Sequence, residues 1–241
     1  MKKILMKIYL KEELNPKIIG LFLPNYFVAK EVYRNMCTLV PELTGRLLDI
    51  GCGTKPFEFM FNVDEYIGLE IDDKGRQNHT HADILYDGEV IPLEDKSFDS
   101  VFSSEVLEHV FNPDTFLKET NRVMKLDGLF LLSTPFFWEE HGQPYDYARY
   151  TSFGLKYILE KNGFEVIKQV KCGNGIEVVF QTISNYIFRT FKWKYPFRLI
   201  VFLLILPFNL MGLMLSKILP KNNDMYLDNI ILAKKIKNLN E

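Results

Sequence analysis

An α/β fold with a mostly parallel β-sheet is predicted by three features of the sequence. From Arg46 onward, short apolar runs alternate with polar, helix-forming segments, as in βαβ units that stack into one sheet. A glycine turn directly follows the first of these runs, and an acidic residue ends the second. The 241 residues are enough for one large domain, or for a smaller domain with a substantial elaboration.

Seven segments carry the apolar pattern expected of strands. They are residues 46–51, 66–71, 81–83, 98–103, 128–134, 164–170 and 226–235. A helix is predicted over Val28–Val40, between prolines. A second helix opens at the cap signal of Asn112 and ends near Gly128, and a third runs from Thr151 or Ser152 to Gly163.

Composition divides the chain into four predicted parts. They are an N-terminal helical flap (1–45), a core (46–180), an apolar helical insertion (181–223), and a final strand with a C-terminal tail (224–241). Within the insertion, Leu199–Leu215 approaches the roughly 17 to 25 apolar residues that span a bilayer, although Pro207 and Asn209 are expected to break it. Because the chain must return to the sheet, the alternatives are a re-entrant hairpin, an interfacial helix, or a buried cap or dimer contact.

Charge and cysteine content exclude other classes of protein. The net charge of −2 and the pI of about 6.1 give no basic field, so no nucleic-acid partner is expected. Three cysteines without C-x-x-C spacing predict neither a disulfide framework nor a zinc site, which favours a reducing cytoplasm. The first residues contain no continuous apolar stretch of the kind found in a signal peptide.

The glycine turn predicts an adenosine ligand. In LLDIGCGT, residues 47–54, a strand ends in Asp49 and is followed by Gly51 and Gly53, and Glu70 ends the next strand, where it can accept hydrogen bonds from a ribose. A dinucleotide site requires a third glycine where this chain has Pro56, which argues against NAD. S-adenosylmethionine has no phosphates. Asp49 suits its cationic end, and the loop amides can take its carboxylate.

Five motifs in order extend this prediction to a family. The runs LLDIGCGTKPFE, YIGLEID, HADI, FDSVFSSEVLEHV and RVMKLDGLFLLSTP resemble the class I S-adenosylmethionine-dependent methyltransferases over about residues 46–170. The resemblance implies a Rossmann-like seven-stranded sheet in the order 3-2-1-4-5-7-6, with the last strand antiparallel. The later run TPFFWEEHGQPYDYARYTSFGLKYILEKNGFEV resembles methyltransferases found with bacterial cell-surface glycan assembly.

The resemblance also implies roles for single residues. The methionine end of the cofactor would lie at Asp49, Gly51 and Gly53, the ribose at Glu70, and the adenine at Asp83 and Ile84. Ser103 would line the site, and Cys52 and Ile71 are further candidate cofactor-binding residues. No metal is expected, because His79 and His81 offer two ligands without an evident third.

The acceptor side is predicted in HGQPYDYARYT, residues 141–151, which follows the fifth strand. His141 is the candidate general base, the alternative being a loop histidine that binds substrate or packs. Candidate substrate-binding residues are Glu105, Tyr145, Asp146, Arg149 and Tyr150. The alternative for this loop is a packed structure in which Arg149 pairs with Asp146, and the two interpretations do not exclude each other. His109, one helical turn after Glu105, is expected to make a structural hydrogen bond.

Together these features predict an enzyme of class EC 2.1.1.- that transfers a methyl group from S-adenosylmethionine to a hydroxyl of a glycan or lipid-linked intermediate. The alternatives are a methyltransferase for a quinone-like or carboxylate small molecule, and a non-catalytic cofactor-fold module at the membrane. We expect a cytoplasmic protein that contacts the inner membrane face peripherally through residues 187–221, which are rich in basic and aromatic side chains. A homodimer is also compatible with the sequence.

Overall fold

The computed structural model describes residues 20–72, 80–191 and 198–239. The chain divides into two compact units. One contains the described residues up to Arg34 together with Lys171–Asp228, and the other contains Asn35–Val170 together with the described residues from Asn229. Residues 20–34 of the predicted N-terminal flap therefore belong to the same unit as the apolar insertion, whereas residues 35–45 belong to the other unit. The units divide at positions other than the predicted residues 45, 180 and 223.

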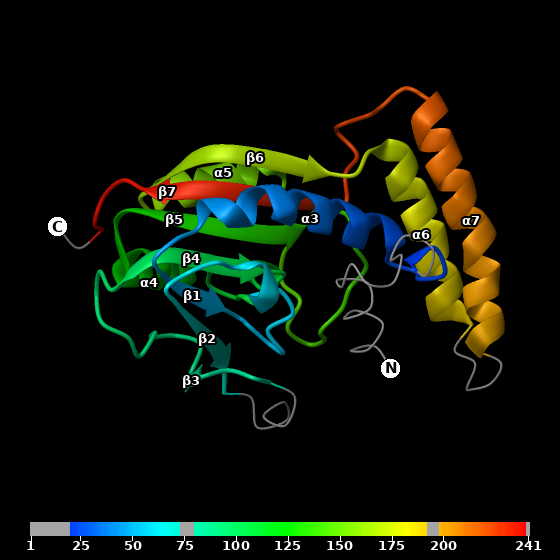
Figure 1. Ribbon diagram of the computed structural model, residues 1–241. Helices are drawn as coiled ribbons and strands as arrows, with labels where there is room; N and C mark the ends of the chain where they lie inside the picture. Colours follow the sequence, from blue (N-terminus) through cyan, green and yellow to red (C-terminus); the bar gives the residue numbers. More distant parts are fainter. Residues whose placement is uncertain (1–19, 73–79, 192–197, 240–241) are drawn as a thin grey trace. The chain divides into compact units, whose positions relative to one another are not determined.

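A seven-stranded sheet has the order β3-β2-β1-β4-β5-β7-β6, as the sequence predicts (Figure 1). Its strands are β1 (Arg46–Ile50), β2 (Glu65–Ile71), β3 (Ile84–Tyr86), β4 (Phe98–Ser104), β5 (Met124–Pro135), β6 (Phe164–Cys172) and β7 (Asp228–Lys235). The pairs β1–β2, β2–β3, β1–β4 and β4–β5 are parallel. Figure 1 shows β7 running against β6, so the predicted antiparallel last strand is confirmed.

The helices are α3 (Tyr26–Leu39), α4 (Pro113–Val123), α5 (Ser152–Lys161), α6 (Gly175–Thr190) and α7 (Arg198–Ile218). Short 3-10 turns are η1 (Val40–Glu42), η2 (Glu58–Met60) and η4 (Leu107–His109). The predicted caps are present: the side chain of Asn112 accepts a hydrogen bond from Thr115 N, and that of Thr151 accepts one from Gly154 N. In Figure 1, α4 and α5 lie on the same face of the sheet, and their buried leucines and phenylalanines join its main hydrophobic core.

Two element boundaries differ from the prediction. The third strand was expected at residues 81–83 but begins at Ile84, because His81 N donates to Gly53 O and Asp83 N to Gly68 O, outside the β2–β3 pairing. The helix expected to reach Gly128 ends at Val123, and β5 begins at the fully buried Met124, which pairs with Phe98. The β4–β5 register then shifts before it resumes at Leu129.

The apolar insertion forms a helical hairpin in which α6 and α7 lie side by side (Figure 1). The expected break at Pro207 and Asn209 is wrong, because α7 continues through both residues. Asn209 is fully buried, accepts a hydrogen bond from Ser184 Oγ at 2.8 Å, and donates to the carbonyls of Leu21 and Leu23 at 2.8 and 3.0 Å. Its amide therefore has protein partners and does not need water, which allows it to stand inside an apolar helix.

One helix of the described residues has the length and composition needed to cross a membrane. It covers Leu199–Ile218, with a mean hydropathy of 2.4, and 22% of its most apolar window is buried. Several apolar side chains of this helix are exposed to solvent, including Leu203, Met214 and Ile218 at 59%, 55% and 70% exposure.

Candidate functional site

The predicted cofactor site begins at the turn after β1, where the backbone conformation favours glycine at two positions with different surroundings. Gly51 and Gly53 have φ angles of +76° and +51°, a region that L side chains rarely enter. A Cβ at Gly51 would lie 2.3 Å from Cγ2 of Val106, so the turn packs directly against the segment after β4. A Cβ at Gly53 would come no nearer than 4.0 Å to Glu70 Oε2, which leaves space above Gly53 for a ligand.

The amides of this turn already have acceptors. Gly51 N and Cys52 N donate to Leu69 O at 2.8 and 3.1 Å, and Gly53 N donates to Glu70 Oε2 at 2.8 Å. The expected use of these amides to bind a carboxylate is therefore not what the hydrogen bonds show. The side chain of Cys52 is buried, and burial raises the pKa of its thiol to about 12, so the thiol is neutral.

Asp49 is a buried carboxyl group with one strong partner. Its exposed fraction is 2%, and the hydroxyl of Tyr66 donates a hydrogen bond to Oδ2. Burial, together with the smaller effect of the Glu70 charge, raises the pKa of Asp49 to about 7 against the lowering effect of the Tyr66 hydrogen bond. A cation bound beside these two carboxyl groups would favour the ionised form of Asp49.

The predicted ribose residue Glu70 and its neighbour Ile71 lie at the end of β2, and the predicted adenine residues lie directly before β3 and at its first position. Glu70 is half-buried and also accepts a hydrogen bond from Ile71 N at 3.1 Å, while Ile71 itself is exposed. Asp83 accepts hydrogen bonds at Oδ2 from Lys55 Nζ at 2.6 Å and Gly68 N at 2.7 Å. Burial opposes ionisation, but these hydrogen bonds outweigh it and lower the pKa of Asp83. The half-buried Ile84 follows directly at the start of β3.

The end of β4 presents three consecutive polar residues in different surroundings. Ser103 is fully buried, and its Oγ has no hydrogen-bond partner within the described part of the chain. Ser104 Oγ lies 2.8 Å from Ser133 Oγ, which donates to Glu105 Oε1 at 2.7 Å. Glu105 is exposed, with a φ of +57° that is uncommon for a residue other than glycine.

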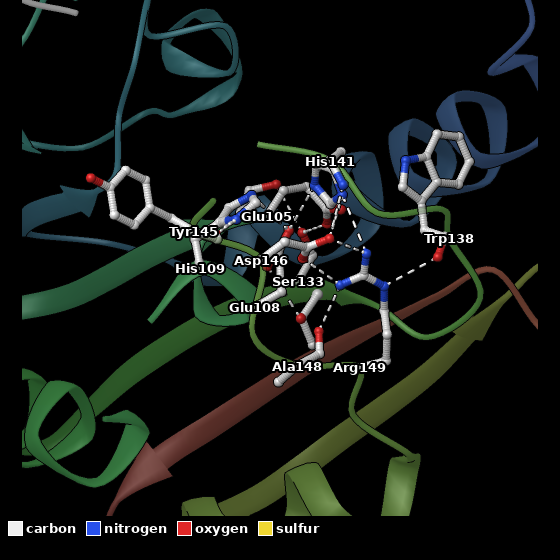
Figure 2. A network of polar contacts seen from close by, with 12 residues as sticks. Glu105, Glu108, His109, Ser133, Trp138, His141, Tyr145, Asp146, Ala148 and Arg149 are labelled. Carbon is white, nitrogen blue, oxygen red and sulfur yellow. Dashed lines mark hydrogen bonds and ion pairs between the residues drawn. The ribbon is translucent and has the colours of Figure 1, made fainter. Parts of the chain in front are cut away.

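A cluster of one carboxyl group and two imidazoles lies beyond β4 and β5 (Figure 2). Glu108 and His109 belong to η4, and His141 belongs to the loop after β5. One ligand atom of each lies within 4.8 Å of the others, and Glu108 Oε1 is 3.7 Å from Nε2 of both histidines. The two rings meet edge to face, with centroids 4.7 Å apart. The carboxyl group of Glu108 raises the pKa of His141, against the effect of burial.

Arg149 holds the loop after β5 together. Its Nη1 and Nη2 donate to the two carboxylate oxygens of Asp146 at 2.6 and 2.7 Å, and its remaining N–H groups reach the carbonyls of Trp138, Glu139 and Ala148 (Figure 2). Asp146 also accepts from His141 N at 2.9 Å. The guanidinium lowers the pKa of Asp146 to about 2. Of the two interpretations of this pair, the packed loop is therefore the one that the structure shows.

The tyrosines of the loop have two kinds of environment. Tyr145 and Tyr147 are 52% and 44% exposed, and each is held by its backbone: Tyr145 O accepts from His109 Nδ1, and Tyr147 N donates to Glu108 O at 2.8 Å. The expected structural hydrogen bond of His109 is therefore present. Tyr150 packs against the main hydrophobic core, and its carbonyl accepts from Asn229 Nδ2 at 2.8 Å. Only Tyr145 and Tyr147 offer their rings to a ligand from outside.

Comparison with known proteins identifies the family. The family model "Methyltransferase domain" matches residues 48–132. A ubiquinone biosynthesis O-methyltransferase of Ruegeria pomeroyi is 27% identical over 203 residues, which cover 70% of this chain and 73% of the relative. A protein of Mycolicibacterium smegmatis named "Probable S-adenosylmethionine-dependent methyltransferase" is 30% identical over 165 residues, 62% of this chain and 63% of the relative. The chain belongs to the class I S-adenosylmethionine-dependent methyltransferases.

The fold of this methyltransferase agrees with that of solved structures. The crystal structure of an S-adenosylmethionine-dependent methyltransferase from Mesorhizobium loti matches it with a TM-score of 0.51 at 15% identity. The match covers 84% of this chain and 96% of that chain. At this level of identity the likeness shows the shared architecture, and the roles of single residues come from the site itself.

The methyltransferase uses S-adenosylmethionine as its cofactor, and its residues fit that ligand. When bound, the cofactor supplies a methyl group on a positively charged sulfur. The carboxyl groups of Asp49 and Glu70 favour a cation beside the glycine turn, where the space above Gly53 is open. We infer that Glu70 holds the ribose hydroxyls and that Asp83 accepts from the adenine amine through Oδ1, since both hydrogen bonds above use Oδ2.

Sequence reasoning missed the central residue of the acceptor side. Glu108 was not among the candidates, yet it is fully buried and lies between His109 and His141. The available signal was the adjacent Glu-His pair directly after a strand end in EVLEHV. The pair of histidines that was weighed for metal is not assembled in the described residues: His79 lies outside them, and the exposed His81 is not part of the cluster.

Proposed function

We propose that this methyltransferase acts on oxygen, and that its acceptor is a hydroxyl of a glycan or lipid-linked intermediate. The observation that carries the proposal is the cluster of Glu108, His109 and His141 beside the cofactor turn. A hydroxyl must lose its proton as it attacks a methyl group, so an O-methyltransferase needs a proton acceptor or an equivalent charge at this position. Contact between Gly51 and Val106 brings the turn after β1 next to the segment that carries Glu108.

In the proposed reaction the enzyme mainly aligns the acceptor oxygen with the methyl carbon. His141 is the candidate base, and its backbone N–H is fixed by Asp146, which is itself fixed by Arg149. The exposed rings of Tyr145 and Tyr147 suit the apolar face of a sugar or of an aromatic acceptor. Glu105, exposed at the end of β4, would hydrogen-bond acceptor hydroxyls.

A quinone-like acceptor is the second candidate, and one comparison favours it. The Ruegeria pomeroyi relative is named as a ubiquinone biosynthesis O-methyltransferase, and this name describes methylation of an oxygen atom. A lipid-linked sugar and a quinone precursor each carry an apolar tail. Either acceptor would therefore require the enzyme to work at a membrane.

We also propose that the protein is cytoplasmic and lies peripherally on the inner membrane face, held there by α7. Apolar side chains are exposed along one face of α7, at Leu199, Ile200, Leu203, Leu204, Leu210, Met211, Met214 and Ile218. Exposed Arg189 precedes this helix, and exposed Lys217 and Lys221 lie at and beyond its end, which suits an anionic lipid surface. The basic and aromatic residues Lys192, Trp193, Lys194 and Tyr195, also predicted to take part, lie outside the described residues.

The acceptor proposal is tested by cofactor turnover on two fractions, membrane glycolipids and quinone precursors, with wild type and His141→Ala side by side. Methylation of a glycolipid hydroxyl supports the leading proposal, and methylation of the quinone fraction alone replaces it with the second. Calorimetry with S-adenosylmethionine is the control for a non-catalytic module. Cofactor binding without turnover on either fraction would contradict O-methylation of these acceptors.

The membrane proposal is tested by co-sedimentation with anionic vesicles. Replacing Leu203 and Met214 by glutamine places two polar groups on the exposed face of α7 and should lower the bound fraction by about tenfold. Phe153→Gln is the matched control, because Phe153 is 82% exposed on α5, in the other unit. Equal binding by all three proteins would refute the role of α7.

A further inference from the structure

We propose that Glu108, His109 and His141 bind a divalent first-row transition metal ion. The catalytic role of the ion rests on the proposed O-methylation, whereas the binding site itself is inferred from the positions of the three side chains. The ligand atoms of the three residues converge within 4.8 Å, with Glu108 Oε1 at 3.7 Å from both Nε2 atoms. Those contacts are longer than hydrogen bonds and leave room for an ion between the three atoms after a small inward movement.

The carboxyl group of Glu108 is the first reason to place a cation here. Its side chain has no exposed area, and Oε1 has no hydrogen-bond partner among the residues that the structure describes. Its other oxygen accepts only a long contact of 3.4 Å from Thr134 Oγ1. The nearest groups that could carry a compensating charge are the two imidazoles, whose Nε2 atoms lie 3.7 Å from Oε1. When both rings are neutral, the buried carboxylate has lost its hydration without a compensating charge, which is costly. A bound cation supplies that charge.

The two histidines are oriented to supply neutral lone pairs. Nδ1 of His109 faces the carbonyl oxygen of Tyr145, which can only accept, so the proton lies on Nδ1 and Nε2 is free to bind. Nδ1 of His141 faces Glu139 O at 3.2 Å and Asp146 Oδ2 at 3.6 Å. The guanidinium of Arg149 also comes within 3.4 Å of this nitrogen, but its N–H groups are directed to Asp146 and Glu139. Carbonyl and carboxylate partners of this kind hold metal-binding histidines in position.

The donor set selects the class of ion. Two imidazole nitrogens and one carboxylate oxygen suit Zn²⁺, Mn²⁺, Fe²⁺ or Co²⁺, whereas Mg²⁺ and Ca²⁺ prefer oxygen ligands alone. Three protein ligands leave at least one coordination position open, which is the arrangement of catalytic rather than structural sites. Side-chain exposures of 28% for His109 and 25% for His141 leave the cluster reachable from solvent.

An ion on the predicted acceptor side would activate the acceptor hydroxyl for methyl transfer. A hydroxyl bound at the open position loses its proton to solvent more easily, because the metal stabilises the negative charge left on oxygen. That oxygen then attacks the methyl carbon, a C–O bond forms, and the C–S bond breaks with its electron pair passing to sulfur, which gives S-adenosylhomocysteine. With Nε2 of His141 bound to the ion, that nitrogen would no longer act as the base of the proposed function. The ion would instead lower the pKa of the acceptor hydroxyl, whose proton passes to solvent.

The site is tested by metal analysis on the full chain, freed of any affinity tag and treated with a chelator. After equilibration with Zn²⁺ or Co²⁺ and gel filtration, wild type should retain one ion per chain, and bound Co²⁺ should give a visible absorption spectrum. Loss of one ligand in Glu108→Gln, His109→Ala or His141→Ala should weaken binding by more than about 100-fold, beyond the effect known for outer-shell partners. His81→Ala removes an exposed histidine outside the cluster and should bind as wild type does.

Cofactor calorimetry on each variant shows that it is folded, and His141→Ala keeps the test valid if the buried Glu108→Gln variant does not fold. Failure of wild type to retain a stoichiometric ion, or equal affinity in wild type and His141→Ala, would overturn the metal site. Stoichiometric metal without turnover on any hydroxyl acceptor supports the site and contradicts the proposed function. Undiminished turnover by protein shown to be free of metal would overturn the role of the ion in catalysis.

Discussion

The buried carboxyl group of Asp49 makes cofactor affinity depend on pH. Its pKa of about 7 means that a large share of the free enzyme carries a neutral Asp49 near neutral pH. If the positive sulfonium of S-adenosylmethionine binds beside Asp49, as we predict from the resemblance, the cofactor should prefer the ionised form. If only that form binds, the observed affinity rises with the ionised fraction, by about tenfold between about pH 6 and about pH 8.

Tyr66→Phe is the perturbation that isolates this effect. The Tyr66 hydroxyl donates to Asp49 Oδ2 and lowers its pKa, so removal of the hydroxyl should raise it. A hydrogen bond to a charged group contributes about 1.5 to 3 kcal/mol, which corresponds to about one to two pKa units. The ionised fraction at about pH 7 would then fall by about 5- to 50-fold, and the affinity for the cofactor with it.

The assay is calorimetric titration with S-adenosylmethionine from about pH 6 to about pH 9, in buffers of different ionisation enthalpy. Binding should release a proton near pH 7, and the variant should shift the midpoint of the pH dependence upward. S-adenosylhomocysteine lacks the sulfonium charge and should show a weaker dependence. Tyr157→Phe, on an exposed tyrosine of α5, is the matched control. A flat pH profile for wild type, or the same midpoint in wild type and Tyr66→Phe, would refute this reasoning.

Three further substitutions test the frame around the site. Arg149→Lys removes the guanidinium fork from its carboxylate partner and should destabilise the protein by about 2 kcal/mol, seen as a melting temperature lower by about 4 to 8 °C; an unchanged melting temperature would contradict the clamp. Gly142→Ala forces a side chain into φ +64° and places a Cβ 2.8 Å from His109 Cε1, so it should cost about 1 to 3 kcal/mol of unfolding free energy. Gly154→Ala, in a helix, is its control. Asn209→Leu leaves two carbonyls unsatisfied and should cost about 2 to 4 kcal/mol by chemical denaturation; a neutral result would mean that water reaches them.

The fold was predictable because its signals are local. Each strand carries its own apolar run. The glycine turn marks the carboxyl end of β1 and therefore the edge of the parallel sheet at which ligands bind. The boundary between α4 and β5 was missed because it depends on a distant partner: Met124 leaves the helix to pair with Phe98. The continuity of α7 was missed for the same reason, since Asn209 is tolerated only by virtue of carbonyls almost two hundred positions earlier in the chain, at Leu21 and Leu23.

The candidate site also contains residues that could be predicted from the sequence and residues that could not. Asp49 and Glu70 could be located because each lies one residue before the end of its strand, and parallel strands end at one edge of the sheet. Asp83 is placed differently from the prediction, since it precedes β3 and is held there by the hydrogen bond that Gly68 N donates to its Oδ2. The approach of His141 to Glu108 could not be inferred, because it requires the loop after β5 to fold back on η4. That return is made by backbone atoms: Tyr147 N and Ala148 N both donate to Glu108 O, at 2.8 and 3.2 Å. Backbone hydrogen bonds of this kind leave no pattern of side chains in the sequence.

The backbone attachment of the loop after β5 has a consequence for how acceptor preference could change during evolution. Arg149 and Asp146 fix the path of the chain. Tyr145 and Tyr147 are anchored by their main-chain atoms, while their side chains stay about half exposed and the ring of Tyr147 meets only the exposed ring of Phe111 among the ring contacts of the described residues. Substitution of either ring therefore alters the chemistry offered to an acceptor without disturbing the loop that carries it. A related enzyme could acquire a new acceptor by exchanging these two side chains alone, with its cofactor turn unchanged.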